Sequence, residues 1–301
     1  MSRITLVAVG LCAVASLAPA QSRSSRDDVS RIDTTFAFDK RGTVSLSIGN
    51  GEVIVTAWNR DEVRVRARSE RNTVRMDATS SRLTLELSRP GTGDTRFEVT
   101  VPVGVRITAR ARQGDITVSG TRGGVEASTQ NGSIQVDDVG DVVDIVTLSG
   151  DISARGIVGR VDIRSTSGTV SVENAKGDVE ATTISGDIIL RGVSARYVRG
   201  KSTSGDIQWD GDIDGTGRYE LASHSGSVYL IVPATTGAQI TVATYNGSID
   251  SEFPIVLRPG EHGVGAARRI TFEIGKGDAR ISAESFSGDV TIRARPARPP
   301  R

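Results

Sequence analysis

Cysteine and histidine are almost missing from this sequence. Cys12 is the only cysteine among 301 residues, and His224 and His262 are the only histidines. Because Cys12 lies in an apolar run at the N-terminus, no disulfide or cysteine-bound metal is expected in the rest of the chain. Neither histidine has another metal-ligating side chain at the usual spacing, so the sequence does not predict a zinc site.

The sequence also lacks an excess of one charge, aromatic side chains and long apolar runs. It has 37 Lys and Arg against 36 Asp and Glu, and 4% of its residues are aromatic. Balanced charge gives no reason to expect nucleic acid or an anionic membrane as a partner. After residue 20 no run is long and apolar enough for a transmembrane helix, so none is expected in the mature chain.

Residues 1–20 are typical of a secretory signal peptide. Arg3 precedes an apolar run, Leu6 to Ala18, that is too short to span a bilayer. Ala18-Pro19-Ala20 has the small-residue form of a cleavage site. Cleavage near Ala20 would release the mature chain, so we expect an exported protein that is periplasmic, at the cell surface or secreted.

Glycine is abundant, with 34 residues, and much of it is periodic. Glycines that follow Ser, Asn or Gln and precede Asp, Ser or Thr recur first every eighteen residues and then at wider intervals. A fixed period of about twenty residues is the signature of a solenoid. Each of these glycines is predicted to be a structural turn that needs a positive φ. They are Gly114, Gly132, Gly150, Gly168, Gly186, Gly205, Gly226, Gly247 and Gly288.

Two segments of alternating apolar and polar residues lie between successive glycines. Period-two alternation places one face of each segment inside and the other in water. Stacked copies should pair in parallel with like residues above one another, which creates columns of inward side chains. One expected column is Ile134, Ile152, Val170 and Ile188, and a second, of hydroxyl side chains, is Thr129, Thr147, Ser165 and Thr183.

These patterns predict an all-β fold, a single-stranded parallel β-helix (β-solenoid) with coils of about 18 residues and an N-terminal strand cap. We favour right-handed winding. The expected organisation is a signal peptide at 1–20, a disordered N-terminus at 21–31, a β-solenoid domain at 32–295 and a basic, proline-rich tail at 296–301. Within the domain we expect N-terminal coils and the cap at 32–106, regular repeats at 107–250, a loop at 251–269 and the last coils at 270–295.

One outward position is acidic in four successive copies. Like charges directly across a strand pair are destabilising. At about 5 Å in water the cost is under ~1 kcal/mol per pair, which solvation and Arg164 can offset. Two interpretations stay open, a solvated acidic stripe and a weak site for calcium or a basic partner, and no other cofactor is expected. The stripe consists of Glu126, Asp144, Asp162 and Glu180.

Aspartates follow several of the periodic glycines and could supply acid–base or calcium chemistry along one edge. Ser and Thr take the same place in other copies, and a hydroxyl can cap a turn but cannot replace a catalytic carboxylate. We therefore expect the aspartates to cap the backbone of their own turns, and we predict no catalytic residue. The aspartates are Asp115, Asp151, Asp187 and Asp206, and the replacements are Ser133, Thr169, Ser227 and Ser248.

A row of apolar and aromatic side chains occupies an outward corner position, two residues before the periodic glycines. Its members either stack on each other along the ladder or form a groove for a partner. The row consists of Leu148, Ile184, His224, Tyr245 and Phe286.

The sequence resembles the bacterial DUF4097 family. The S/N-G-[DST]-[IV] rungs, "VTVPVGVRITARARQGDITV", the "EFPI" break and "ITFEIGKGDARISAESFSGDVTIR" carry this resemblance over about Gly42 to Arg293. The family consists of β-strand repeat proteins labelled as adhesins. The resemblance implies an exported parallel β-helix and brings no catalytic residue.

The expected function is that of an exported, non-enzymatic β-solenoid binding or scaffold protein. Like an adhesin, it would present flat ladder faces to an envelope protein or a polysaccharide. The alternative is a polysaccharide lyase or hydrolase built on a parallel β-helix. Free variation of the outward rows, and the lack of long insertions over one wall, favour binding. A structural envelope protein without a ligand is a third possibility.

Overall fold

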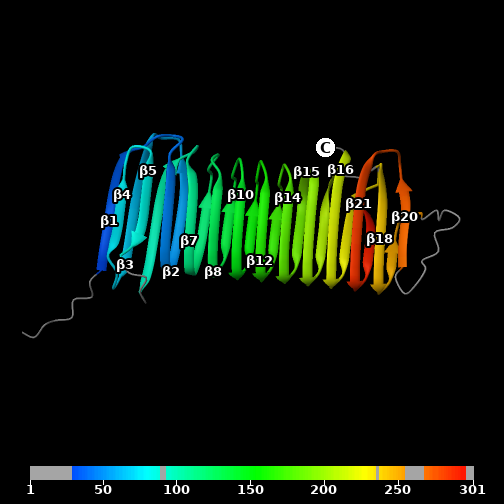
Figure 1. Ribbon diagram of the computed structural model, residues 1–301. Helices are drawn as coiled ribbons and strands as arrows, with labels where there is room; N and C mark the ends of the chain where they lie inside the picture. The colour runs from blue at the N-terminus through cyan, green and yellow to red at the C-terminus, as the bar shows by residue number, and fades with distance from the viewer. Residues whose placement is uncertain (1–28, 89–92, 235–236, 255–267, 296–301) are drawn as a thin grey trace, which may run out of the picture.

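The computed structural model describes residues 29–88, 93–234, 237–254 and 268–295, and in these ranges the chain forms strands and no helix. Figure 1 shows the strands side by side along one long axis. The strands are β1 (Val29–Ala37), β2 (Thr43–Trp58), β3 (Glu62–Glu70), β4 (Val74–Ala78), β5 (Arg82–Leu87), β6 (Asp94–Pro102), β7 (Arg106–Ser119), β8 (Val125–Asn131), β9 (Ile134–Asp137), β10 (Val143–Ser149), β11 (Ile152–Arg155), β12 (Val161–Ser167), β13 (Val170–Glu173), β14 (Val179–Ser185), β15 (Ile188–Ser204), β16 (Ile207–Ser225), β17 (Val228–Pro233), β18 (Ala238–Asn246), β19 (Ile249–Ser251), β20 (Arg268–Ile274), β21 (Ala279–Ser287) and β22 (Val290–Arg295).

Two walls meet at the corner glycines. Wall A contains the strands that lead to a glycine, such as β8, β10, β12 and β14, and wall B contains those that follow it, such as β9, β11 and β13. Neighbours within each wall pair in parallel, and Asp144 lies beside Glu126 on one side and Asp162 on the other. The all-β prediction is therefore confirmed. Right-handed winding stays a prediction.

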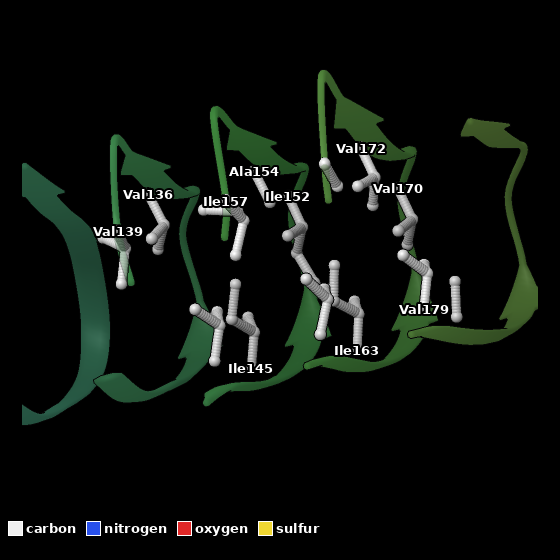
Figure 2. Packing of buried hydrophobic residues seen from close by; sticks show 14 of the residues in the cluster. Val136, Val139, Ile145, Ile152, Ala154, Ile157, Ile163, Val170, Val172 and Val179 are labelled. Atoms are coloured by element: carbon white, nitrogen blue, oxygen red, sulfur yellow. The ribbon is translucent and has the colours of Figure 1, made fainter. Parts of the chain in front are cut away.

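The core is a set of aligned columns between the walls. Ile134, Ile152, Val170 and Ile188 are in cross-strand register and at most 1% exposed, as the sequence predicts. Figure 2 shows side chains of both walls, among them Ile152 and Ile163, pointing into the space between the walls. The half-turn opposite the glycines adds a third buried column of Val139, Ile157, Ala175 and Val193.

The half-turn column has its own backbone signature. Asp138 and Asn174 adopt left-handed φ values of 53° and 54°, and Gly156 and Gly192, at the same place in the neighbouring copies, adopt 65° and 62°. A Cβ at Gly156 would lie close to Oδ1 of Asp138, and one at Gly192 close to Oδ1 of Asn174. Short polar side chains and glycines therefore alternate, because each Asp or Asn occupies space that the next glycine leaves empty.

The order of the coils in space differs from their order in the sequence at both ends. Near the C-terminus, β21 lies between β16 and β18, and β22 lies between β17 and β19. Near the N-terminus, β2 lies between β7 and the later strands β5 and β6. Followed from the centre of the stack toward either end, the chain therefore skips one position, forms strands further out, and then returns to occupy the skipped position.

Antiparallel strands close both ends of the stack. Strand β4 pairs with β5 and β3 with β6, while β1 pairs with β3 at the N-terminal end. Strand β20 pairs antiparallel with β18 at the other end of wall A. Most of the loop predicted at 251–269, the predicted segments 1–20 and 296–301, and residues 21–28 of the predicted disordered N-terminus at 21–31 lie outside the described residues. The prediction of disorder is wrong for residues 29–31, because they begin strand β1 and pair with β3, and residues 268–269 of the predicted loop belong to β20. No membrane-spanning helix is found in the described part of the chain.

Candidate binding faces

The corner glycines stack backbone on backbone. A Cβ at Gly168 would approach the carbonyl oxygen of Gly150 to less than 3.0 Å, and the same holds at the other periodic glycines, each against the coil before it in space. Six of the nine also have a left-handed φ, for example 116° at Gly168. The predicted left-handed φ does not hold at Gly114, Gly247 and Gly288. At these three, close approach alone requires glycine.

The corner aspartates bind the next coil and not their own turn. Oδ1 of Asp151 accepts a hydrogen bond of 2.8 Å from the backbone N–H of Thr169, and Oδ1 of Asp206 accepts one of 2.7 Å from Ser227. The expectation of a cap within the same turn is therefore wrong, because the coil that stacks above presents an open N–H at this corner. Asp115 and Asp187 make the same contact, to Ser133 and Asp206.

The predicted acidic stripe exists, and arginines neutralise much of it. Arg110 reaches Glu126 at 2.7 Å, Arg199 reaches Glu180 at 3.5 Å, and Arg164 lies between Asp144 and Asp162 at 3.6 and 2.7 Å. Burial raises the pKa of Asp162, and the carboxylates of Asp144 and Glu180 also raise it, whereas Arg164 lowers it.

No group of three or more His, Cys, Asp or Glu side chains in the described residues could hold a metal ion. Calcium binding by Glu126, Asp144, Asp162 and Glu180 therefore rests on the sequence pattern alone and stays a prediction.

Three members of the apolar corner row form a stack of rings. Phe286 lies between His224 and Tyr245, with ring centroids 4.8 and 4.9 Å away and interplanar angles of 13° and 3°. These distances equal the spacing of neighbouring strands, so the stack follows the solenoid axis. Ring faces contact each other and ring edges point to solvent. Leu148 and Ile184 lie further along the same corner and are 54% and 53% exposed.

A shallow depression on wall A, which we call the C-terminal depression, lies beside this ring stack. It consists of two hollows of about 420 and 540 Å³ that share Lys201, Ala222 and Glu284. Its floor combines the small outward side chains Ala222, Ser282, Thr241 and Ala243 of β16, β21 and β18 with the carboxylates of Glu220 and Glu284, which pair with arginines. The pattern of sequence repeats did not reveal this depression, since its strands are not consecutive in the chain.

Basic side chains surround the C-terminal depression. Arg218 and Arg280 occupy directly opposed positions on β16 and β21. Arg218 is held by Glu220 at 2.6 Å and Arg269 by Glu284 at 3.1 Å. Lys201 and Arg280 are exposed and make no salt bridge with any described residue. The depression therefore combines free cations, ring edges and hydroxyl groups.

Comparison with known proteins places the chain in a family. The family model for Toastrack DUF4097 matches residues 39–293. The chain belongs to the Toastrack DUF4097 family. No curated protein matches it. The family membership agrees with the resemblance seen in the glycine rungs.

Comparison with solved structures matches this Toastrack chain to several bacterial proteins. A "putative adhesin" from Bacteroides fragilis has 10% identity and a TM-score of 0.36, with 87% of this chain and 96% of that chain covered. A "putative cell adhesion protein" from Clostridium sporogenes has 12% identity and a TM-score of 0.25, with 88% and 100% covered. A "putative adhesin" from Parabacteroides merdae has 9% identity and a TM-score of 0.33, with 88% and 97% covered.

Proposed function

We propose that this Toastrack protein is exported and acts as a non-enzymatic β-solenoid that binds a protein or polysaccharide of the cell envelope, as an adhesin does. The C-terminal depression is the observation that carries this proposal. It offers two cations, Lys201 and Arg280, that have no salt-bridge partner in the described part of the chain and lie beside exposed aromatic side chains. The signal-like residues 1–20 support export.

The corner aspartates support binding over catalysis. Oδ1 of Asp151, Asp187 and Asp206 is occupied by a backbone N–H of the neighbouring coil. An aspartate that holds the backbone of the neighbouring coil in this way has a structural role in the stack.

Two measurements test the proposal. Expression of the full chain in a bacterial host, followed by fractionation and N-terminal sequencing, should find a mature chain beginning near Gln21 outside the cytoplasm. The purified mature chain should then sediment with isolated cell envelopes, and excess unlabelled protein should compete. A chain that stays cytoplasmic or fails to bind envelopes would contradict the proposal, and release of new reducing ends from envelope polysaccharide would replace it with the enzymatic alternative.

A further inference from the structure

The C-terminal depression has an arrangement of charge that its own residues do not satisfy. Arg218 and Arg280 face each other across neighbouring strands, where like charges destabilise the pair. Glu220 neutralises Arg218, but Arg280 has no salt-bridge partner among the described residues. Lys201 lies across the same depression, also without one. A bound anion would relieve the repulsion at Arg280 and pair with Lys201.

The ring stack adds to this preference for negative charge. Because His224, Phe286 and Tyr245 stack face to face, they turn their edges to the depression. Ring edges carry the positive part of the aromatic quadrupole. They therefore favour anionic groups, and they leave few ring faces on which an uncharged sugar could stack.

The floor distinguishes a sugar chain from a peptide. Strands β16, β21 and β18 are hydrogen-bonded on both sides, so the floor has no open sheet edge to which a peptide strand could add. It also has no deep apolar pocket for a side-chain anchor, since small or polar side chains line it, among them Ala222, Ala243, Thr241 and Ser282, whose hydroxyl donates a hydrogen bond to Glu284. A flat, hydroxyl-lined floor suits a chain that carries its own hydroxyls.

Resting on the proposed function, we propose that the C-terminal depression binds a strand of acidic polysaccharide. Its carboxylates lie against Arg280 and Lys201, and its hydroxyls lie against Ser282 and Thr241. The strand follows the solenoid axis, because the two cations and the ring stack are spread over four neighbouring strands of wall A, β15, β16, β21 and β18.

The test compares the full mature chain with two double variants. Lys201→Gln/Arg280→Gln removes the free cations, and Lys176→Gln/Arg112→Gln removes one lysine and one arginine that are exposed elsewhere on the solenoid. Calorimetric titration uses polygalacturonate as the probe, with neutral dextran and poly-glutamate as comparisons. Melting curves and circular dichroism check that each variant is folded.

The wild-type chain is expected to bind polygalacturonate more tightly than dextran or poly-glutamate, and to bind it less tightly as salt is added. Lys201→Gln/Arg280→Gln should weaken binding about tenfold, since it removes two charge contacts of the exposed class, and the control pair should not. Absence of polygalacturonate binding, equal binding of dextran or poly-glutamate, or equal loss in both double variants would overturn the proposal. Envelope binding without polygalacturonate binding would overturn this inference and leave the proposed function standing.

Discussion

Two separate conditions can require glycine at a corner, and Gly168 meets both. Its φ is 116°, and its Cα faces the carbonyl oxygen of Gly150 in the neighbouring coil. An alanine there would be strained by its own backbone and would push the two coils apart. Gly215, in contrast, has nothing within 4 Å of an added Cβ and no left-handed φ.

Gly168→Ala is therefore expected to lower the free energy of unfolding by about 1–3 kcal/mol or more. Gly215→Ala should change it by no more than about 0.5 kcal/mol, as is usual for an exposed site without special geometry. Urea denaturation followed by circular dichroism measures both. Equal effects in the two variants would show that neither close stacking nor backbone conformation requires glycine at position 168.

Asp289 should stabilise the fold at neutral pH and not in acid. The backbone N–H and the hydroxyl of Ser248 both bind its carboxylate at 2.8 Å, and they hold its pKa below the ordinary value of 3.8. A lowered pKa contributes stability that is present above 3.8 and lost as the pH falls through the folded value. Asp289→Asn should thus be less stable than wild type at pH 7, with a gap that closes in acid. Asp77→Asn serves as a control in melting curves across pH, and a gap independent of pH would contradict the assignment.

Asp162 should behave in the opposite way. Burial and neighbouring carboxylates raise its pKa, and its Oδ1 is buried without a hydrogen bond. The penalty of its charge is present above the raised folded pKa and absent below 3.8, so stability falls as the pH rises between these values. Asp162→Asn should raise the melting temperature at pH 7 and not at pH 3.

Melting curves of Asp162→Asn and wild type, recorded with a chelator and with millimolar calcium, check this expectation and the calcium prediction together. If calcium raises the melting temperature of wild type alone, the acidic stripe binds cations. A variant less stable than wild type at pH 7 in chelator would show that the Arg164 pair outweighs burial.

At the level of the strands, two outward rows arrange their charges in different ways. The wall B row Asp137, Arg155, Glu173, Arg191 and Asp210 alternates in sign from strand to strand. The acidic stripe on wall A has a carboxylate on each of four strands, and Arg110 and Arg164 from the neighbouring outward row form salt bridges with it. In both rows each charge has an opposite charge nearby, whereas Arg280, directly opposite Arg218, has no salt-bridge partner among the described residues.

The ring stack is expected to hold the last coils together. Phe286 contacts both His224 and Tyr245, and each aromatic pair contributes about 0.5–1.5 kcal/mol beyond its buried area. Phe286→Ala should therefore cost about 1–2 kcal/mol of unfolding free energy, whereas Leu148→Ala, at an exposed corner without a ring partner, should cost much less. Denaturant titration of the two variants gives the comparison, and equal costs would mean that the rings do not interact.

Capture of envelope material by the same variants separates the two interpretations of the apolar corner row. A loss of capture in Leu148→Ala and Ile184→Ala, with the fold intact, would favour a partner groove along the whole corner. Unchanged capture in both would restrict the row to stacking.

In the whole molecule, the last strands of the sequence are not the last strands of the stack. Strands β21 and β22 have neighbours on both sides, and Arg295 at the end of β22 binds Asp210 and Asp212. Removal of a terminal coil from a simple solenoid costs that coil alone. Here, removal of the final coil opens a gap within the stack.

A chain truncated after Gly277 should therefore lose hydrogen-exchange protection in β18 and at the exposed side of β16. A chain truncated after Pro233 lacks β18 to β22 altogether and ends at a continuous edge. It should retain protection up to β15, although it is the shorter protein. Mass spectrometry of amide exchange compares each truncation with the full chain, and protection of β18 in the longer truncation equal to that in the full chain would show that β18 and β20 fold without β21.

The periodic sequence was sufficient to predict the columns of the core and the position of the corners. Like residues recur at a fixed interval, and parallel pairing with any neighbouring copy places Ile134, Ile152 and Val170 in line. Every copy satisfies this rule equally well, so the period cannot say which copies are neighbours at the ends. That choice depends on long-range pairing with the antiparallel caps, which places β21 between β16 and β18. Only the tertiary structure therefore brings Arg280 beside Arg218 and Phe286 between His224 and Tyr245, and with them the surface on which function is proposed.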